Sequence, residues 1–223
     1  MAIKRITMFE ISFILQLLSI AFGLVLYNRI KPVVLKLLIP LIILGAINEG
    51  FSYWGLYKGM KINKLIIYNL YFIFQFIIIG VIHIVILKRY IKLKKLITIF
   101  LILLFIVGFF FLNNNLKQLD PNAITMASLS LLVSGIILLF KLNVVEETIF
   151  LKTNAIFWFT VGMIIAQTFL ILFINALRVD DFRNDINSMM IFKLLNTVGN
   201  VFYYLLICLS FFCSWRYRQP EFT

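Results

Sequence analysis

The chain has little charge for its length, and acidic charge is especially scarce. Of its 223 residues 63% are hydrophobic and 13% are charged, with 21 basic residues against nine acidic ones. Soluble domains are about 45–50% apolar and about 25% charged. A chain so poor in charge cannot bury its apolar surface in one core surrounded by water, so lipid must solvate most of it. The composition therefore excludes an ordinary soluble domain.

The scarcity of acidic residues leaves a net charge of +12. In a soluble protein this charge would suggest nucleic-acid binding. Here the basic residues form short clusters between apolar runs, which is typical of a membrane protein held against anionic headgroups. We therefore expect contact with a lipid bilayer and none with nucleic acid.

Residues that carry chemistry are also few: two cysteines and one histidine. Cys208 and Cys213 are five residues apart on one expected helix and point in different directions, so no disulfide is expected between them. His83 has no second histidine or carboxylate near it in the sequence, which favours a packed, hydrogen-bonded side chain. No metal-ligand spacing, phosphate loop or nucleophile–base arrangement is present. The sequence predicts no enzyme, no catalytic residues, no metal and no cofactor.

Seven apolar runs are long enough to cross ~30 Å of hydrocarbon, which takes about 20 helical residues. Only helices satisfy their own backbone in lipid over such runs, and no barrel-like alternation is seen. The prediction is an all-α polytopic membrane protein, a single seven-transmembrane-helix bundle over residues 1–223. The runs are 8–27, 33–57, 65–87, 96–112, 122–140, 155–177 and 188–214.

Orientation follows from the basic residues at the ends of the runs, because the more basic side faces the cytoplasm. The side that holds the N-terminus has eight of them and the other side has twelve, with the cluster at 88–95 contributing most. We therefore expect the N-terminus outside and the C-terminus in the cytoplasm. The first side carries Lys4, Arg5, Lys58, Lys61, Lys64, Lys117, Arg178 and Arg183; the second carries Arg29, Lys31, Lys36, Lys88, Arg89, Lys92, Lys94, Lys95, Lys141, Lys152, Arg216 and Arg218.

The fourth run differs from the others because Thr98 is its one polar residue between 96 and 112. A helix that is apolar all round fits a lipid-facing position. It leaves three runs on either side, which permits a 3+1+3 arrangement of two parallel three-helix repeats. The connection from Lys141 to Thr153 is either a short interfacial helix or a plain connector.

The sequence Asn48-Glu49-Gly50-Phe51-Ser52-Tyr53 places a carboxylate inside the second run. A charge deep in hydrocarbon costs roughly 2.5–3.5 kcal/mol on insertion scales and marks a functional site by default. Counting from the nearest charge at ~1.5 Å per residue puts Glu49 ~13 Å deep. The same count places other polar residues in this layer of the outer half. The predicted ligand-binding residues are Glu49, Asn69, Gln75, Gln167, Lys193, Asn196 and Asn200.

The last run has the clearest polar face. Lys193, Asn196 and Asn200 are spaced i, i+3, i+7 and share one stripe of a helix. Since Lys193 counts to ~12 Å depth, we hypothesise that it pairs with Glu49. The alternative for the amides of this layer is structural, because such groups also hold membrane helices together.

Four short motifs carry a resemblance over nearly the whole chain: Asn48-Glu49-Gly50-x-Ser-Tyr, Tyr68-Asn69-x-Tyr-x-x-x-Gln-Phe, Phe157-Trp158-Phe-Thr-Val-Gly and Asn196-x-x-x-Asn200-x-x-Tyr-Tyr. With them the chain resembles uncharacterised small seven-span proteins of Bacteroidota-type bacteria, many of which carry Glu where Gln75 stands. It is more distantly similar to the seven-span sensor regions of histidine kinases. The resemblance implies a location in the bacterial inner membrane.

The sequence favours two functions. The first is a receptor or sensor that binds a small or lipid-like ligand in the outer half and signals through a separate cytoplasmic or membrane partner. The second is a small-solute transporter built from two three-helix repeats around the same polar layer. Superposable triplets around a central pathway would favour the transporter, whereas a receptor needs an outward pocket alone. An intramembrane or lipid-modifying enzyme ranks behind these two functions, because no catalytic arrangement is present, and a scaffold without a ligand also stays open.

Overall fold

The fold described here comes from a computed structural model, which describes residues 8–58, 64–113, 120–145, 151–179 and 185–217. Over these ranges the chain forms helices and short turns and no strand. Each of the seven apolar runs corresponds to one long helix, and the run at 33–57 also includes a short 3-10 helix at its start. The long helices are α1 (Met8–Val25), α2 (Leu38–Lys58), α3 (Lys64–Leu87), α4 (Leu93–Asn113), α5 (Pro121–Val145), α7 (Ala155–Ala176) and α9 (Ile186–Arg216). Two short 3-10 helices, η1 (Tyr27–Arg29) and η2 (Val33–Leu37), connect α1 to α2.

Six of the helices in the described ranges are long and apolar enough to cross a membrane. The protein is therefore a multi-pass helical membrane protein. The apolar part of α1, Glu10–Val25, is shorter than the others. A seventh span at α1 stays a prediction.

Three helices begin at residues whose side chains accept hydrogen bonds from the free backbone N–H groups of the first turn. Asp120 Oδ1 accepts from the N–H of Asn122 at 2.8 Å and precedes Pro121, the first residue of α5. Asn154 caps α7 and Asp185 caps α9 in the same way. These caps set where each helix starts, at positions close to the ends of the apolar runs.

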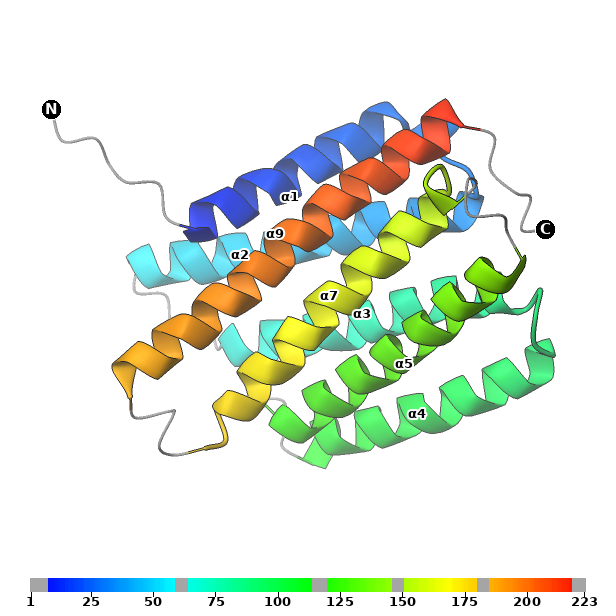
Figure 1. Cartoon of the computed structure of the whole chain (residues 1–223). Coiled ribbons are helices and arrows are strands. Elements are labelled where there is room, and N and C mark those ends of the chain that lie inside the picture. The colour runs from blue at the N-terminus through cyan, green and yellow to red at the C-terminus, as the bar shows by residue number, and fades with distance from the viewer. Residues whose placement is uncertain (1–7, 59–63, 114–119, 146–150, 180–184, 218–223) are drawn as a thin grey trace, which may run out of the picture.

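Six helices form a closed ring. Around it α1 contacts α2, α2 contacts α3, α3 contacts α5, α5 contacts α7, α7 contacts α9, and α9 returns to α1. The helices run roughly parallel to one another, with the start of α1 and the end of α9 at opposite ends of the bundle (Figure 1). The residues that face the middle of this ring come from segments far apart in the sequence.

The helix α4 lies outside the ring, against α3 and α5 (Figure 1). Inside the bundle 11% of its apolar window is buried, against 39–44% for the other five candidate spans. Phe105 is 75% exposed, whereas Val107 and Phe111 are the buried residues of this helix. This confirms the expectation that the fourth run is the peripheral one.

Small residues and backbone acceptors hold the ring together, as is usual between membrane helices. A Cβ on Gly199 would lie 2.8 Å from Phe169 Cδ2, so α7 and α9 approach closely there. Ser210 Oγ donates to the carbonyl oxygen of Ala155 at 2.7 Å across the same pair. On the other side of α9, Ser19 Oγ donates to the carbonyl oxygen of Tyr204 at 3.1 Å.

The half of the ring that contains the start of α2 and the end of α3 is packed with aliphatic and aromatic side chains. Five large side chains there have no exposed surface: Leu38, Ile82, Ile86, Ile156 and Phe211. This is the half that the basic residues assign to the cytoplasmic side. Buried polar residues such as His83 and Ser210 lie among these apolar side chains. Glu49 and the amides predicted to bind a ligand lie toward the other end of the ring.

The connection from Lys141 to Thr153 begins as helix, since α5 continues to Val145 and so passes the end predicted for the fifth run. Residues 146–150 lie outside the described ranges, so the choice between an interfacial helix and a plain connector stays open. No disulfide joins Cys208 and Cys213, as expected.

Candidate functional site

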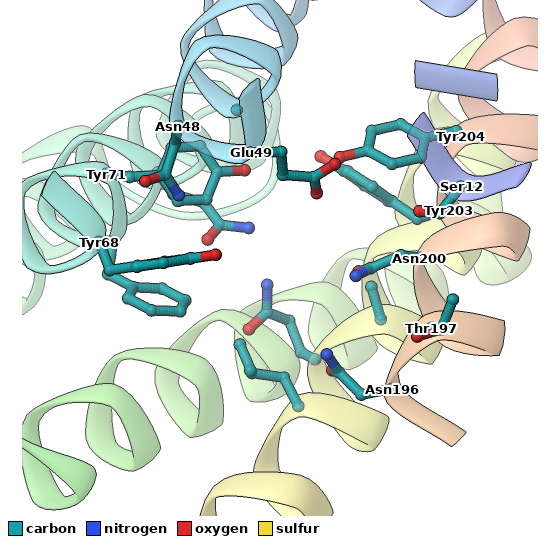
Figure 2. A pocket seen from close by; sticks show the side chains of 16 residues that line it. Ser12, Asn48, Glu49, Tyr68, Tyr71, Asn196, Thr197, Asn200, Tyr203 and Tyr204 are labelled. Carbon is teal, nitrogen blue, oxygen red and sulfur yellow. The ribbon is translucent and has the colours of Figure 1, made fainter. Parts of the chain in front are cut away.

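A partly open cavity of about 200 Å³ lies within the ring. Its walls come from α1, α2, α3, α7 and α9, and none of its lining residues belongs to α5. Figure 2 shows these side chains converging from opposite helices. The lining residues are Ser12, Gly45, Asn48, Glu49, Tyr68, Tyr71, Phe72, Gln75, Ala166, Gln167, Leu170, Asn196, Thr197, Asn200, Tyr203 and Tyr204.

Helical periodicity explains which residues reach the cavity. On α2 the contributors Gly45, Asn48 and Glu49 are spaced i, i+3, i+4. On α3, Tyr68, Phe72 and Gln75 follow the spacing i, i+4, i+7, with Tyr71 beside them. The lining residues of α9 form a similar stripe from Asn196 to Tyr204. The stripes of α2, α3 and α9 thus supply most of the polar groups.

At Gly45, side chains from both α1 and α3 approach α2 closely. A Cβ at this position would lie 2.6 Å from Gln16 Nε2 and 3.2 Å from Tyr71 Oη. The absent side chain lets Gln16 Nε2 donate to the carbonyl oxygen of Ile42 at 3.2 Å. It also leaves room for the Tyr71 hydroxyl at the wall of the cavity. Glycine at this position therefore shapes the cavity as well as the helix packing.

Of the described residues that line the cavity, Glu49 is the one that carries a charge. Its Oε2 atom is enclosed and has no hydrogen-bond partner among the described residues. The carboxylate points from α2 toward the side where Tyr203 and Tyr204 project from α9 (Figure 2). Asn48 Oδ1 and Tyr203 Oη are likewise enclosed and without a partner in the described ranges. The site therefore presents a set of oxygen atoms whose hydrogen-bonding capacity the protein leaves unused.

Five of the seven residues predicted from the sequence to bind a ligand line this cavity: Glu49, Gln75, Gln167, Asn196 and Asn200. They come from four helices. Counting depth from the nearest charge placed Glu49, Gln75, Gln167 and Asn196 in one layer, and the helical spacing of the last run added Asn200. The ring brings all five around one space. Whether they bind a ligand stays a prediction.

Lys193 is a different case, and the hypothesis that it pairs with Glu49 is wrong. Lys193 is exposed and does not line the cavity, and Glu49 Oε2 has no partner. The reason lies in the length of α9, which has 31 residues and is therefore ~46 Å long. From the start of α9 up to Val198, none of the described side chains is buried. The start of α9 therefore projects past its neighbours, and Lys193 lies on that projecting part.

Asn69 is fully buried but is not among the lining residues. It follows Tyr68 directly, so its side chain is rotated by about 100° around α3 from the stripe that faces the cavity. Asn69 therefore belongs to the packing between helices at the same level of the bundle.

The sequence analysis did not select several lining residues, chiefly Ser12, Tyr68, Tyr71 and Thr197. A signal for the two tyrosines was available, because residues at i−7 and i−4 from Gln75 share its helix face. Ser12 carried no such signal, since a single serine in an apolar run is as common in helix contacts as in a site.

His83 lies on another part of α3 and has the structural environment that was expected. Its Nδ1 is 2.6 Å from Ser134 Oγ on α5, and the Ser134 hydroxyl donates to the carbonyl oxygen of Leu131. The histidine N–H is therefore the donor to Ser134. A hollow of about 80 Å³ beside it is lined mainly by apolar side chains. Over the described ranges no group of three or more His, Cys, Asp or Glu residues is placed to hold a metal ion.

Comparison with protein-family models, with curated proteins and with solved structures gives no match to this chain. The fold and the cavity therefore carry the functional argument by themselves. The resemblance to small bacterial seven-span proteins stays a prediction from the sequence motifs.

Proposed function

We propose that this chain is a seven-span receptor-like protein of a bacterial cytoplasmic membrane that binds a small ligand in the cavity around Glu49. The observation that carries the proposal is the division of the ring into two halves. One half holds a cavity of about 200 Å³ with a carboxylate, amides and tyrosine hydroxyls in its wall. The other half is filled by apolar side chains such as Ile82 and Phe211. Concave sites with a few placed polar groups are the usual form of small-molecule sites.

The proposed orientation puts the cavity in the outer half and the basic cluster at 88–95 in the cytoplasm. It follows from the excess of Lys and Arg at that end of the bundle. A ligand would then reach the cavity from outside, and its effect would pass along the helices to the basic face. We propose that a separate cytoplasmic or membrane partner receives the signal there. The exposed Lys88, Arg89, Lys92, Lys94 and Lys95 offer that partner, or anionic lipid, a charged surface.

A small-solute transporter is the second candidate, and the order of helices in the ring favours it. In both triplets, α1–α2–α3 and α5–α7–α9, each helix contacts the next, and the contacts α3–α5 and α9–α1 join the triplets at both ends. This is the neighbour pattern of two parallel repeats with α4 outside. The lining of the cavity is unequal, however, because α1 contributes Ser12 while its counterpart α5 contributes no residue. We rank the receptor first for this reason and because apolar packing fills the opposite half.

The test is ligand-dependent stabilisation of the purified chain in nanodiscs, using small-molecule fractions from the source cells. A ligand at 100 times its Kd stabilises the folded state by about 2.7 kcal/mol, which thermal unfolding resolves easily. We expect Ala166→Leu, which adds three carbons at the cavity wall, to abolish the stabilisation. Ala21→Leu is the matched control, because Ala21 is exposed on the surface of α1. If no fraction stabilises the chain, or Ala166→Leu responds like the wild type, the proposal fails.

Transport and reception are then separated by sealed vesicles that contain the purified chain. A receptor binds the active compound without moving it, so the compound inside the vesicles stays at the level of empty vesicles. Accumulation that Ala166→Leu removes and Ala21→Leu keeps would establish the transporter instead.

A further inference from the structure

We propose that the ligand of the cavity is a small organic cation with a primary ammonium group, held against the carboxylate of Glu49. The inference rests on the proposed function and names the chemical class of its ligand. It is carried by three features of the described site: its charge, its unused acceptors and its size with the aromatic wall around it.

Among the described residues that line the cavity, Glu49 alone is charged. A carboxylate withdrawn from water either takes up a proton or is stabilised by a positive partner close by, because neither lipid nor apolar protein solvates its charge. None of the described side chains supplies that partner, as Lys193 is exposed elsewhere on α9. An anionic ligand would add a second negative charge beside Glu49 and is disfavoured. A cationic ligand completes the ion pair.

The unused hydrogen-bonding groups point to the same class. Glu49 Oε2, Asn48 Oδ1 and Tyr203 Oη are enclosed oxygens without partners in the described ranges. Leaving such a group unsatisfied costs about 1–3 kcal/mol. The Glu49 and Asn48 oxygens each need a donor, whereas the Tyr203 hydroxyl can donate or accept. An ammonium group has three donors and no acceptor. Ordered water also donates hydrogen bonds, but it leaves the carboxylate without a positive charge.

The size and walls of the cavity limit the rest of the ligand. An engineered apolar cavity of about 150 Å³ binds benzene. At about 200 Å³ this cavity takes a molecule somewhat larger than benzene. Aromatic side chains from α3 and α9, among them Tyr71, Phe72 and Tyr204, surround the space. Aromatic rings attract cations through their faces and also contact the carbon skeleton of an amine.

Three probes of similar size and different charge test the inference. Cyclohexylammonium is the cation, cyclohexanol the neutral analogue and cyclohexanecarboxylate the anion. Their Kd values are measured by calorimetry on the full chain in nanodiscs, for the wild type, Glu49→Gln and Glu10→Gln. Glu10→Gln is the matched control, because it removes one acidic charge from α1 without altering a lining residue.

We expect the wild type to bind cyclohexylammonium in preference to the other two probes. Glu49→Gln should raise the Kd of the cation at least about ten-fold, the size expected when one member of a desolvated charge pair is removed. The Kd of cyclohexanol should stay unchanged in this variant, and Glu10→Gln should behave as the wild type. Gel filtration and circular dichroism establish that each variant is folded, and Glu49→Asp, which keeps the charge, should retain preference for the cation.

The inference and the proposed function fail in different ways. If Ala166→Leu abolishes binding of a cellular ligand but Glu49→Gln leaves that binding intact, the site is real and the ligand is not a cation. Equal affinity for cyclohexanol and cyclohexylammonium would overturn the inference in the same way. If neither the probes nor the cellular fractions bind, both are overturned.

Discussion

Gly45 links the packing of the ring to the shape of the cavity, and replacing it with alanine tests both. The new Cβ would lie 2.6 Å from Gln16 Nε2 and 3.2 Å from Tyr71 Oη. Atoms do not approach that closely, so the Gln16 amide must move away. It then loses its hydrogen bond to the carbonyl oxygen of Ile42.

The expected size of the effect combines three contributions. The lost hydrogen bond costs about 1 kcal/mol, and inserting a methyl group into a packed contact costs about 1–3 kcal/mol. Alanine is favoured over glycine inside a helix by roughly 0.5–1 kcal/mol, which offsets part of this. Gly45→Ala should therefore lower the free energy of unfolding by about 1–3 kcal/mol.

Gly50 provides the matched control on the same helix. A Cβ there meets nothing within 4 Å, so Gly50→Ala keeps only the helix preference. It should raise the free energy of unfolding by roughly 0.5–1 kcal/mol, a change opposite in sign to that of Gly45→Ala. The assay is reversible unfolding in mixed micelles, followed by circular dichroism. If the two variants change stability equally, the close approach of α1, α2 and α3 at Gly45 is refuted.

Three further predictions concern other parts of the bundle. Hydrogen bonds from the Ser188 hydroxyl and the first backbone N–H groups of α9 hold the pKa of Asp185 below its ordinary value of 3.8. The stabilisation from this cap is therefore complete above pH 3.8 and is lost as the pH falls through the lower pKa of Asp185 in the folded state. A ¹³C NMR titration should show that the pKa of Asp185 rises in Ser188→Ala. A double-mutant cycle with His83→Ala and Ser134→Ala should give a coupling free energy of about 0.6 kcal/mol, which is the average for hydrogen bonds between membrane helices. Zero coupling would contradict the hydrogen bond of 2.6 Å between His83 Nδ1 and Ser134 Oγ. In a cysteine-free background, Lys92→Cys should react with an impermeant maleimide from the cytoplasmic side alone, and labelling from outside would reverse the proposed orientation.

Most of the helical architecture was accessible from the sequence, because membrane spans depend on the length of apolar runs. The run predicted at 65–87 became α3 (Lys64–Leu87), and the run at 155–177 became α7 (Ala155–Ala176). The position of α4 was also predictable, since its one polar residue leaves nothing to turn inward. The order of the helices around the ring was not predictable, because it depends on contacts such as Gly199 against Phe169 that no single run contains.

The site was predictable where depth and helical phase agreed. Glu49 and Asn196 had both, and they line one cavity. Lys193 had the right spacing along the helix, but its depth was counted as though Asp185, at the start of α9, lay at the membrane surface. The additional length of α9 displaced it from the site. The enclosed state of Glu49 Oε2 could not be foreseen, because it depends on the absence of a partner from every neighbouring helix.

The central claim is that the cavity around Glu49 is a ligand site, and a structure tests it most directly. The chain should be extracted from its own membrane into lipid nanodiscs and imaged by cryo-electron microscopy at a resolution that separates ligand from side chains. We predict non-protein density larger than water inside the cavity, in contact with the Glu49 carboxylate. A cavity filled by inward-turned side chains and water, with Glu49 paired to another residue of the chain, would contradict the account.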